Sequence, residues 1–231
     1  MADPFDLHLT RRRLLGAGAA TGLAVALGAC SLQQSSAVDS DTADADAEWG
    51  GTYLDPPFEK PDVTFTDFDG NPYPIREKTK GRLTALFFGY TNCPDVCPIY
   101  LNTLASARAT IGSGPGSRPI VLFVGVDTER DTPERMKEYL GAIDETFIGL
   151  TADPDVIAQA LDDLKLGQPV FYEPETPGGP YRVDHPATIV VYSPDDLAHR
   201  IYPSDVRQEI WVKDLPRLDQ GLVGSSEETG A

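Results

Sequence analysis

Two cysteines, Cys93 and Cys97, are the residues of this chain whose types and spacing could do chemistry. They belong to the segment Cys-Pro-Asp-Val-Cys-Pro, which directly follows an apolar run at residues 83–88. Thiols four positions apart can form a reversible disulfide, or they can supply two sulfur ligands of a metal site. A plain structural disulfide is the third possibility, because exported proteins often contain one.

The position of this cysteine pair favours reactive thiols. If the apolar run is a buried strand and a helix follows it, the cysteines lie at a helix N-terminus, where N–H groups and the helix dipole stabilise a thiolate. Pro98 lacks an N–H, so we expect the helix to begin near Cys97 and to leave Cys93 in the loop. Residues i and i+4 share a helix face, so both sulfurs can reach one atom or bond to each other.

The elements that must position the pair alternate between strand and helix patterns. Continuous apolar runs predict strands covered on both faces, and Thr132 before Pro133 is a strong helix start. This order favours an α/β protein with a thioredoxin-like fold, in which a central mixed sheet has helices on both faces. We expect strands at 63–66, 83–88, 120–126, 147–150, 187–192 and 200–202, and helices after Cys97, Thr132 and Asp153 and around 210–215.

Composition sets limits on the class of protein. The chain has 231 residues and a formal net charge of −17. A nucleic-acid surface needs clusters of Lys and Arg, which are absent here, so we expect no nucleic-acid partner. The length and apolar content favour one globular domain, which we place at residues 58–223, followed by a polar tail at 224–231.

The N-terminal segment has the features of an export signal. Three arginines at 11–13 precede a weakly apolar stretch that ends in Leu-Gly-Ala-Cys at residues 27–30, which resembles a lipoprotein cleavage site. We therefore expect a twin-arginine lipoprotein signal peptide at 1–29, lipidation at Cys30 and an acidic flexible linker at 30–57. An uncleaved anchor helix is the alternative. Either reading places the domain in the cell envelope, at the outer face of the cytoplasmic membrane.

Three separated segments carry a family resemblance. They are residues 87–98 with the cysteine pair, residues 126–133 with the sequence Val-Asp-Thr-Glu-Arg-Asp-Thr-Pro, and residues 183–185 with the sequence Val-Asp-His. In order and spacing they resemble the Sco/SenC family, and the resemblance covers residues 58–221. Asn92 and Thr128 depart from residues common in the family, but neither departure removes a chemical group of the site.

The resemblance implies a copper-binding, thioredoxin-like protein that assembles the binuclear copper centre of cytochrome c oxidase. Its metal ligands would be Cys93, Cys97 and His185, holding Cu(I) or Cu(II). The implied partners are the copper-bearing oxidase subunit and another copper carrier. Three further residues match family positions, and we read them as supporting or structural groups: Asp127, Arg130 and Asp131.

Two functions from different classes remain open. In a copper chaperone, Cys93, Cys97 and His185 all bind the metal ion. In a thiol-disulfide oxidoreductase, Cys93 and Cys97 are the redox-active pair that keeps the oxidase cysteines reduced, and His185 is not required. A peroxidase on the same fold is a more distant alternative. His199 is expected to be a surface residue without a role in the site.

Overall fold

A computed structural model of the chain describes residues 49–203 and 205–224. The expected signal peptide and the lipidation site at Cys30 lie outside these residues. No helix in the described ranges is long and apolar enough to cross a membrane.

In chain order the elements are β1 (Thr52–Glu59), β2 (Thr64–Asp67), β3 (Pro72–Pro74), α2 (Ile75–Lys78), β4 (Thr84–Gly89), α3 (Val96–Ile111), β5 (Ile120–Gly125), α4 (Pro133–Gly141), β6 (Ile148–Thr151), α5 (Pro154–Asp163), β7 (Val170–Phe171), β8 (Val183–Asp184), β9 (Thr188–Tyr192), β10 (Leu197–Pro203) and α6 (Gln208–Asp219).

Among the described residues, eight strands form one mixed sheet in the order β1-β10-β9-β4-β5-β6-β2-β3. Strand β4 lies inside this sheet, parallel to β5 and antiparallel to β9, with Phe87 opposite Phe123 and Ile189. Strand β6 continues the parallel part beside β5. Every residue of β4 is buried. This burial accounts for its continuous apolar sequence, because a strand with covered faces has no solvent side to carry polar residues.

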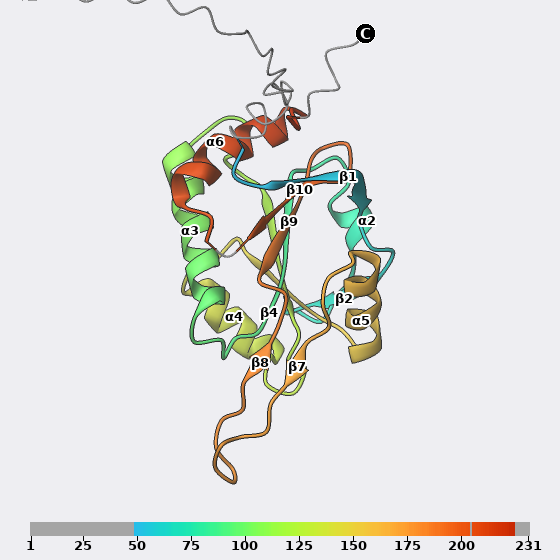
Figure 1. The fold of residues 1–231 in the computed structure, drawn as a ribbon, viewed down its shortest axis with the longest axis vertical. Helices are drawn as coiled ribbons and strands as arrows, with labels where there is room; N and C mark the ends of the chain where they lie inside the picture. The colour runs from blue at the N-terminus through green and yellow to red at the C-terminus, as the bar shows by residue number, and fades with distance from the viewer. Residues whose placement is uncertain (1–48, 204, 225–231) are drawn as a thin grey trace, which may run out of the picture. The chain divides into compact units, whose positions relative to one another are not determined.

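Helices cover both faces of the sheet, as the thioredoxin-like prediction requires. Figure 1 shows α3 and α6 on one side of the sheet and α5 on the other. Helix α4 begins as predicted, with the Thr132 side chain accepting from the Arg135 N–H at 3.3 Å and Pro133 in the first turn. The α/β fold with a mixed central sheet is therefore confirmed.

The first strand differs from the sequence expectation. Residues 30–57 were expected to be linker, but β1 begins at Thr52 and pairs antiparallel with β10. Trp49, before it, is buried beneath the guanidinium groups of Arg200 and Arg217. The ordered sheet therefore starts ahead of residue 58. The segment before Thr52 lacks an apolar period, and β1 itself contains no buried residue, so the sequence shows no strand pattern here.

A short antiparallel ribbon, β7 paired with β8, extends away from the main sheet (Figure 1). Its second strand leads directly to His185. The ribbon therefore places His185 near the end of β4.

Candidate metal centre

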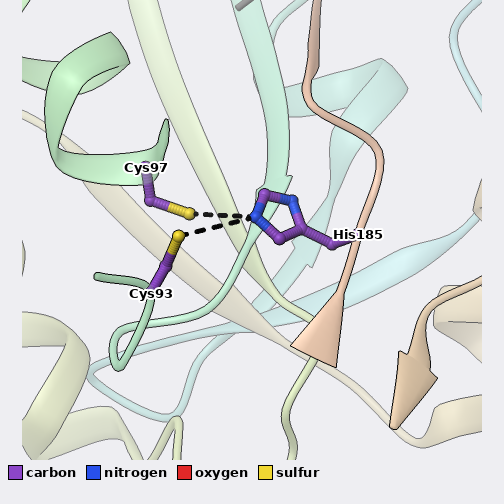
Figure 2. Close-up of side chains that lie close together, drawn as sticks. All are labelled: Cys93, Cys97 and His185. Carbon is purple, nitrogen blue, oxygen red and sulfur yellow. Dashed lines mark hydrogen bonds between the residues drawn. The ribbon is translucent and has the colours of Figure 1, made fainter. Parts of the chain in front are cut away.

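Three elements place the predicted metal-binding side chains at one end of β4 (Figure 2). Cys93 lies in the loop between β4 and α3, and Cys97 lies in the first turn of α3. His185 follows β8 immediately. The helix begins at Val96, as the position of Pro98 indicated, and it leaves Cys93 in the loop.

The three side chains converge on one point. Nε2 of His185 lies 3.3 Å from Sγ of Cys97 and 3.8 Å from Sγ of Cys93. The three candidate ligand atoms all lie within 4.8 Å of one another. Within the described ranges this is the one cluster of three or more His, Cys, Asp or Glu side chains with such geometry. Both cysteines are free thiols.

The backbone of β4 fixes the tautomer of His185. Its Nδ1 lies 2.9 Å from the carbonyl oxygen of Phe88 and 3.2 Å from that of Pro186. A carbonyl oxygen only accepts, so Nδ1 must carry the hydrogen and donate it. Nε2 is then left with a lone pair facing the two sulfurs. This is the arrangement in which a histidine binds a metal ion, with the second ring nitrogen held by a backbone acceptor.

The two thiols have opposite electrostatic environments. A hydrogen bond from Cys97 lowers the pKa of Cys93 to about 3, and the N–H groups of Cys97 and Asp95 act in the same direction. Burial raises the pKa of Cys97. Cys93 retains 9% of its surface exposed, whereas Cys97 has none. The pair therefore combines a thiolate that keeps a little exposed surface, Cys93, with a fully buried thiol, Cys97.

Close packing holds the sulfur and the imidazole in place. The rings of Phe87 and Tyr90 meet the His185 ring edge to face, with centroids 5.7 and 5.5 Å away. At the end of β4, a Cβ added to Gly89 would lie 2.8 Å from Sγ of Cys97. Gly89 is therefore required for the close approach of the strand backbone to the buried sulfur.

A buried carboxylate holds the loop that leads to Cys93. Asp131 accepts from the N–H and the hydroxyl of Thr91, both at 2.8 Å, and from the N–H of Asp127 at 3.2 Å. Burial raises the pKa of Asp131, while the hydrogen bonds from Thr91 oppose that shift. Asp131 does not reach the cluster itself. It acts on the site by fixing the backbone two residues before Cys93.

A second contact joins this loop to the segment before His185. Arg130 pairs with Asp127, and its guanidinium lies 3.6 Å from the centre of the Tyr181 ring. The Tyr181 hydroxyl donates to Asp127 at 2.8 Å, and Arg130 donates to the Tyr181 carbonyl oxygen at 3.1 Å. The loop 127–131 therefore contacts both chain segments that carry the cluster.

The structure brings together the three side chains that the sequence singled out, and it shows supporting contacts that sequence reasoning missed. Gly89, the Phe88 carbonyl and Tyr181 carry no motif of their own, and only the fold shows that they contact the site. His199 lies apart from it on β10 and pairs with Asp195 at 2.7 Å. Its side chain is only 13% exposed, so it is more covered than the expected surface residue.

Comparisons with known proteins identify the family of this chain. The family model described as SCO1/SenC matches residues 54–219. The mitochondrial protein SCO2 of Saccharomyces cerevisiae is 32% identical over 155 residues, which are 66% of this chain and 48% of the yeast protein. The chain thus spans about half the length of that relative.

Solved structures share the fold. The structure of Bradyrhizobium japonicum ScoI with copper bound is 31% identical, with a TM-score of 0.60, and the match covers 70% of this chain and 99% of that one. The apo Sco1 protein from Thermus thermophilus is also 31% identical, with a TM-score of 0.58, and the match covers 75% and 96% of the two chains.

Proposed function

This chain belongs to the SCO1/SenC family, and from that premise we propose that it is a copper chaperone. Cys93, Cys97 and His185 would hold one copper ion and pass it to the copper-bearing subunit of cytochrome c oxidase, for assembly of the binuclear copper centre. The observation that carries the proposal is the convergence of two sulfurs and an imidazole nitrogen within 4.8 Å. The copper-bound relative from Bradyrhizobium japonicum supports the choice of metal.

The donor set fits copper better than zinc. Two soft sulfurs and an imidazole suit Cu(I) and can also hold Cu(II). A structural zinc site needs four protein ligands, and the described residues offer three. A three-ligand site leaves one side of the ion open, so a ligand of a partner protein can bind before the chaperone releases it. Cys93, the more exposed sulfur, lies where such an exchange would begin.

A second function, reduction of a partner disulfide, is favoured by the asymmetry of the two thiols. The Cys93 thiolate would attack one sulfur of the partner disulfide and release the other as a thiolate. Cys97 would then lose its proton and attack Cys93, so that the Cys93–Cys97 disulfide forms and the second partner sulfur leaves reduced. The partner gains two electrons and this protein loses two. This reaction makes no use of His185 as a ligand.

Copper titration of the reduced and oxidised protein tests the main proposal. The reduced chain should retain one copper per monomer against a competing chelator, and the oxidised chain should retain none, because its sulfurs are no longer available as thiolates. Failure of the reduced protein to retain copper would reject the chaperone function. Turnover of a disulfide substrate by the same metal-free protein would then favour the reductase.

We also propose attachment of the protein to the outer face of the cytoplasmic membrane through a lipid on Cys30. Its support is the sequence pattern at residues 11–30 alone. Feeding cells an alkyne-labelled fatty acid should label the wild-type protein and not Cys30→Ser. Equal labelling of both proteins, or of neither, would contradict lipidation at this residue.

A further inference from the structure

A cavity of about 730 Å³ lies at the end of the central strands away from the metal centre. Its wall includes Ile120 and Ile148, the first residues of β5 and β6, and Arg82, just before β4. Strands β4, β5 and β6 are parallel, and the cysteines follow the far end of β4. The cavity and the metal centre therefore lie at opposite ends of these strands, and the cavity is a separate site.

Positive charge is concentrated in this cavity although the chain is strongly acidic. Four cationic side chains line it, against the single carboxylate of Asp144: Lys78, Arg82, Arg108 and Arg118. The whole chain has 19 Lys and Arg against 36 Asp and Glu, so a cavity with this balance opposes the charge of the rest of the molecule. A concave surface lined by one sign of charge focuses the potential and attracts ions of the opposite sign.

Among the described residues, one of these four cationic side chains has a carboxylate partner. Arg108 pairs with Asp144 at 2.7 Å. Within the described ranges, no carboxylate lies within 4.0 Å of the charged groups of Lys78, Arg82 and Arg118. These three basic side chains are exposed and have no carboxylate partner among the described residues, so they can bind an external anion.

The floor of the cavity adds an apolar surface and a hydrogen-bond donor. Ala105, Ala109 and the two isoleucines line it together with the ring of Tyr73, which is largely buried. No hydrogen bond within the described residues involves the Tyr73 hydroxyl. Burial raises the pKa of Tyr73 to about 12, so the hydroxyl stays protonated and can donate to an oxyanion.

We propose that this cavity binds an oxyanion of the phosphate class, carried either by a soluble phosphate compound or by a phospholipid headgroup. Arg82, Arg118 and Lys78 supply the charge, and guanidinium groups suit phosphate because they donate two parallel hydrogen bonds. The volume suits a ligand larger than inorganic phosphate, with its apolar portion on the floor. This proposal does not depend on the copper function.

The lipid anchor proposed above is what makes a phospholipid headgroup an alternative to a soluble ligand. Gly116, in the loop that borders the cavity, lies against the backbone of Leu215 and Pro216 in α6. Trp49, the first described residue, packs on Arg217 of the same helix. Figure 1 shows α6 at the opposite end of the fold from β7 and β8. The cavity therefore lies towards the end at which the described chain begins.

Inorganic pyrophosphate, titrated calorimetrically into the full chain, tests the site. We expect saturable binding of one pyrophosphate at millimolar concentrations or below, weakened about tenfold or more in the double variant Arg82→Gln/Arg118→Gln. The control Arg135→Gln/Arg207→Gln removes the same charge from positions outside the cavity and should bind as wild type. Amide shifts at Gly112 and Ile148 should report the location.

Vesicle sedimentation then identifies the source of the phosphate. Excess binding to phosphatidylglycerol over phosphatidylcholine vesicles, lost in Arg82→Gln/Arg118→Gln, would support a headgroup ligand. Pyrophosphate binding without that excess would support a soluble ligand. Absence of both kinds of binding, or equal losses in the two double variants, would overturn the proposal. Copper retention, measured on the same proteins, should be unchanged and so tests the chaperone function separately.

Discussion

Nδ1 of His185 donates a hydrogen bond of 2.9 Å to the carbonyl oxygen of Phe88, across 97 positions of the chain. Phe88 belongs to β4, the strand that leads into the cysteine loop. The same strand therefore fixes both the start of the loop that carries Cys93 and the orientation of the imidazole. Because Nδ1 donates to the Phe88 carbonyl oxygen, Nε2 keeps its lone pair, which faces the two sulfurs.

The first prediction concerns this imidazole. His185→Ala should weaken copper retention by the reduced protein by about 100-fold or more, because loss of a ligand should cost more than loss of an outer partner. A competition titration against a Cu(I) chelator measures the change. Disulfide exchange through Cys93 should continue, since His185 takes no part in forming or breaking the sulfur bonds.

His199→Ala is the matched control for this prediction. His199 pairs with Asp195 on β10 and lies outside the cluster. It should retain copper as the wild type does. If His185→Ala bound copper as tightly as His199→Ala, the ligand assignment of His185 would be wrong.

The elements that the sequence predicts correctly are those with a strong local sequence signal. The buried strands β4 and β5 show as continuous apolar runs, and α4 shows through Thr132 and Pro133. Each of these signals lies within a few neighbouring residues. The strand β1 gives no such signal, because none of its residues is buried and it forms by pairing with β10, far along the chain.

The support around the site could not be read in the same way. The three ligand candidates were found because their types carry chemistry and their segments resemble a known family. The Phe88 carbonyl and the packing of Gly89 on Cys97 are tertiary contacts of ordinary residues. Such contacts depend on which strands become neighbours, and no local pattern records that choice.

The second prediction concerns the accessible thiolate. With the pKa of Cys93 near 3, the thiolate persists at every pH above that value and is lost only as the pH falls through it. The alkylation rate of Cys93 should therefore be nearly constant between about pH 5 and pH 8, whereas an ordinary thiol would slow roughly tenfold per unit. Iodoacetamide kinetics on reduced, metal-free Cys30→Ser protein measure this.

Two variants at Cys97 test the cause of the lowered pKa. Cys97→Ser keeps a hydroxyl donor for the Cys93 sulfur, so its alkylation rate should stay nearly independent of pH. Cys97→Ala removes the donor, so the pKa of Cys93 should rise and the rate should increase with pH. Identical pH profiles for these two variants would show that the hydrogen bond from Cys97 is not the main cause.

The third prediction uses the close approach of β4 to the buried sulfur. A methyl group at Gly89 would meet Sγ of Cys97 and Cε2 of Phe123, each at 2.8 Å. Gly89→Ala should therefore lower the free energy of unfolding by about 1–3 kcal/mol and weaken copper retention, because the sulfur must move. Denaturant unfolding of the reduced, metal-free protein and the chelator competition measure the two effects.

Gly141→Ala is the control for added volume. A Cβ at Gly141, the last residue of α4, would have no heavy atom within 4 Å. It should raise the free energy of unfolding by up to about 1 kcal/mol, because alanine loses less conformational freedom in a helix. Equal copper affinity in both variants would contradict the proposed displacement of Cys97.

The fourth prediction concerns Asp131 as a positioning residue. Its carboxylate accepts from Thr91 through one oxygen and from the Asp127 N–H through the other. In Asp131→Asn, either orientation of the amide turns an NH₂ group towards one of these donors. We expect a loss of about 1–3 kcal/mol in the free energy of unfolding. The loosened loop before Cys93 should also weaken copper retention and slow Cys93 alkylation.

Three further substitutions separate positioning from general stability. Thr91→Ser keeps both donors to Asp131 and should behave as wild type, whereas Thr91→Val loses the hydroxyl and should show part of the Asp131→Asn effect. Asp69→Asn removes an exposed carboxylate that pairs with Lys137, and it should change little. If Asp131→Asn lost stability while copper affinity and Cys93 alkylation stayed at wild-type values, the carboxylate would hold the fold and not the metal centre.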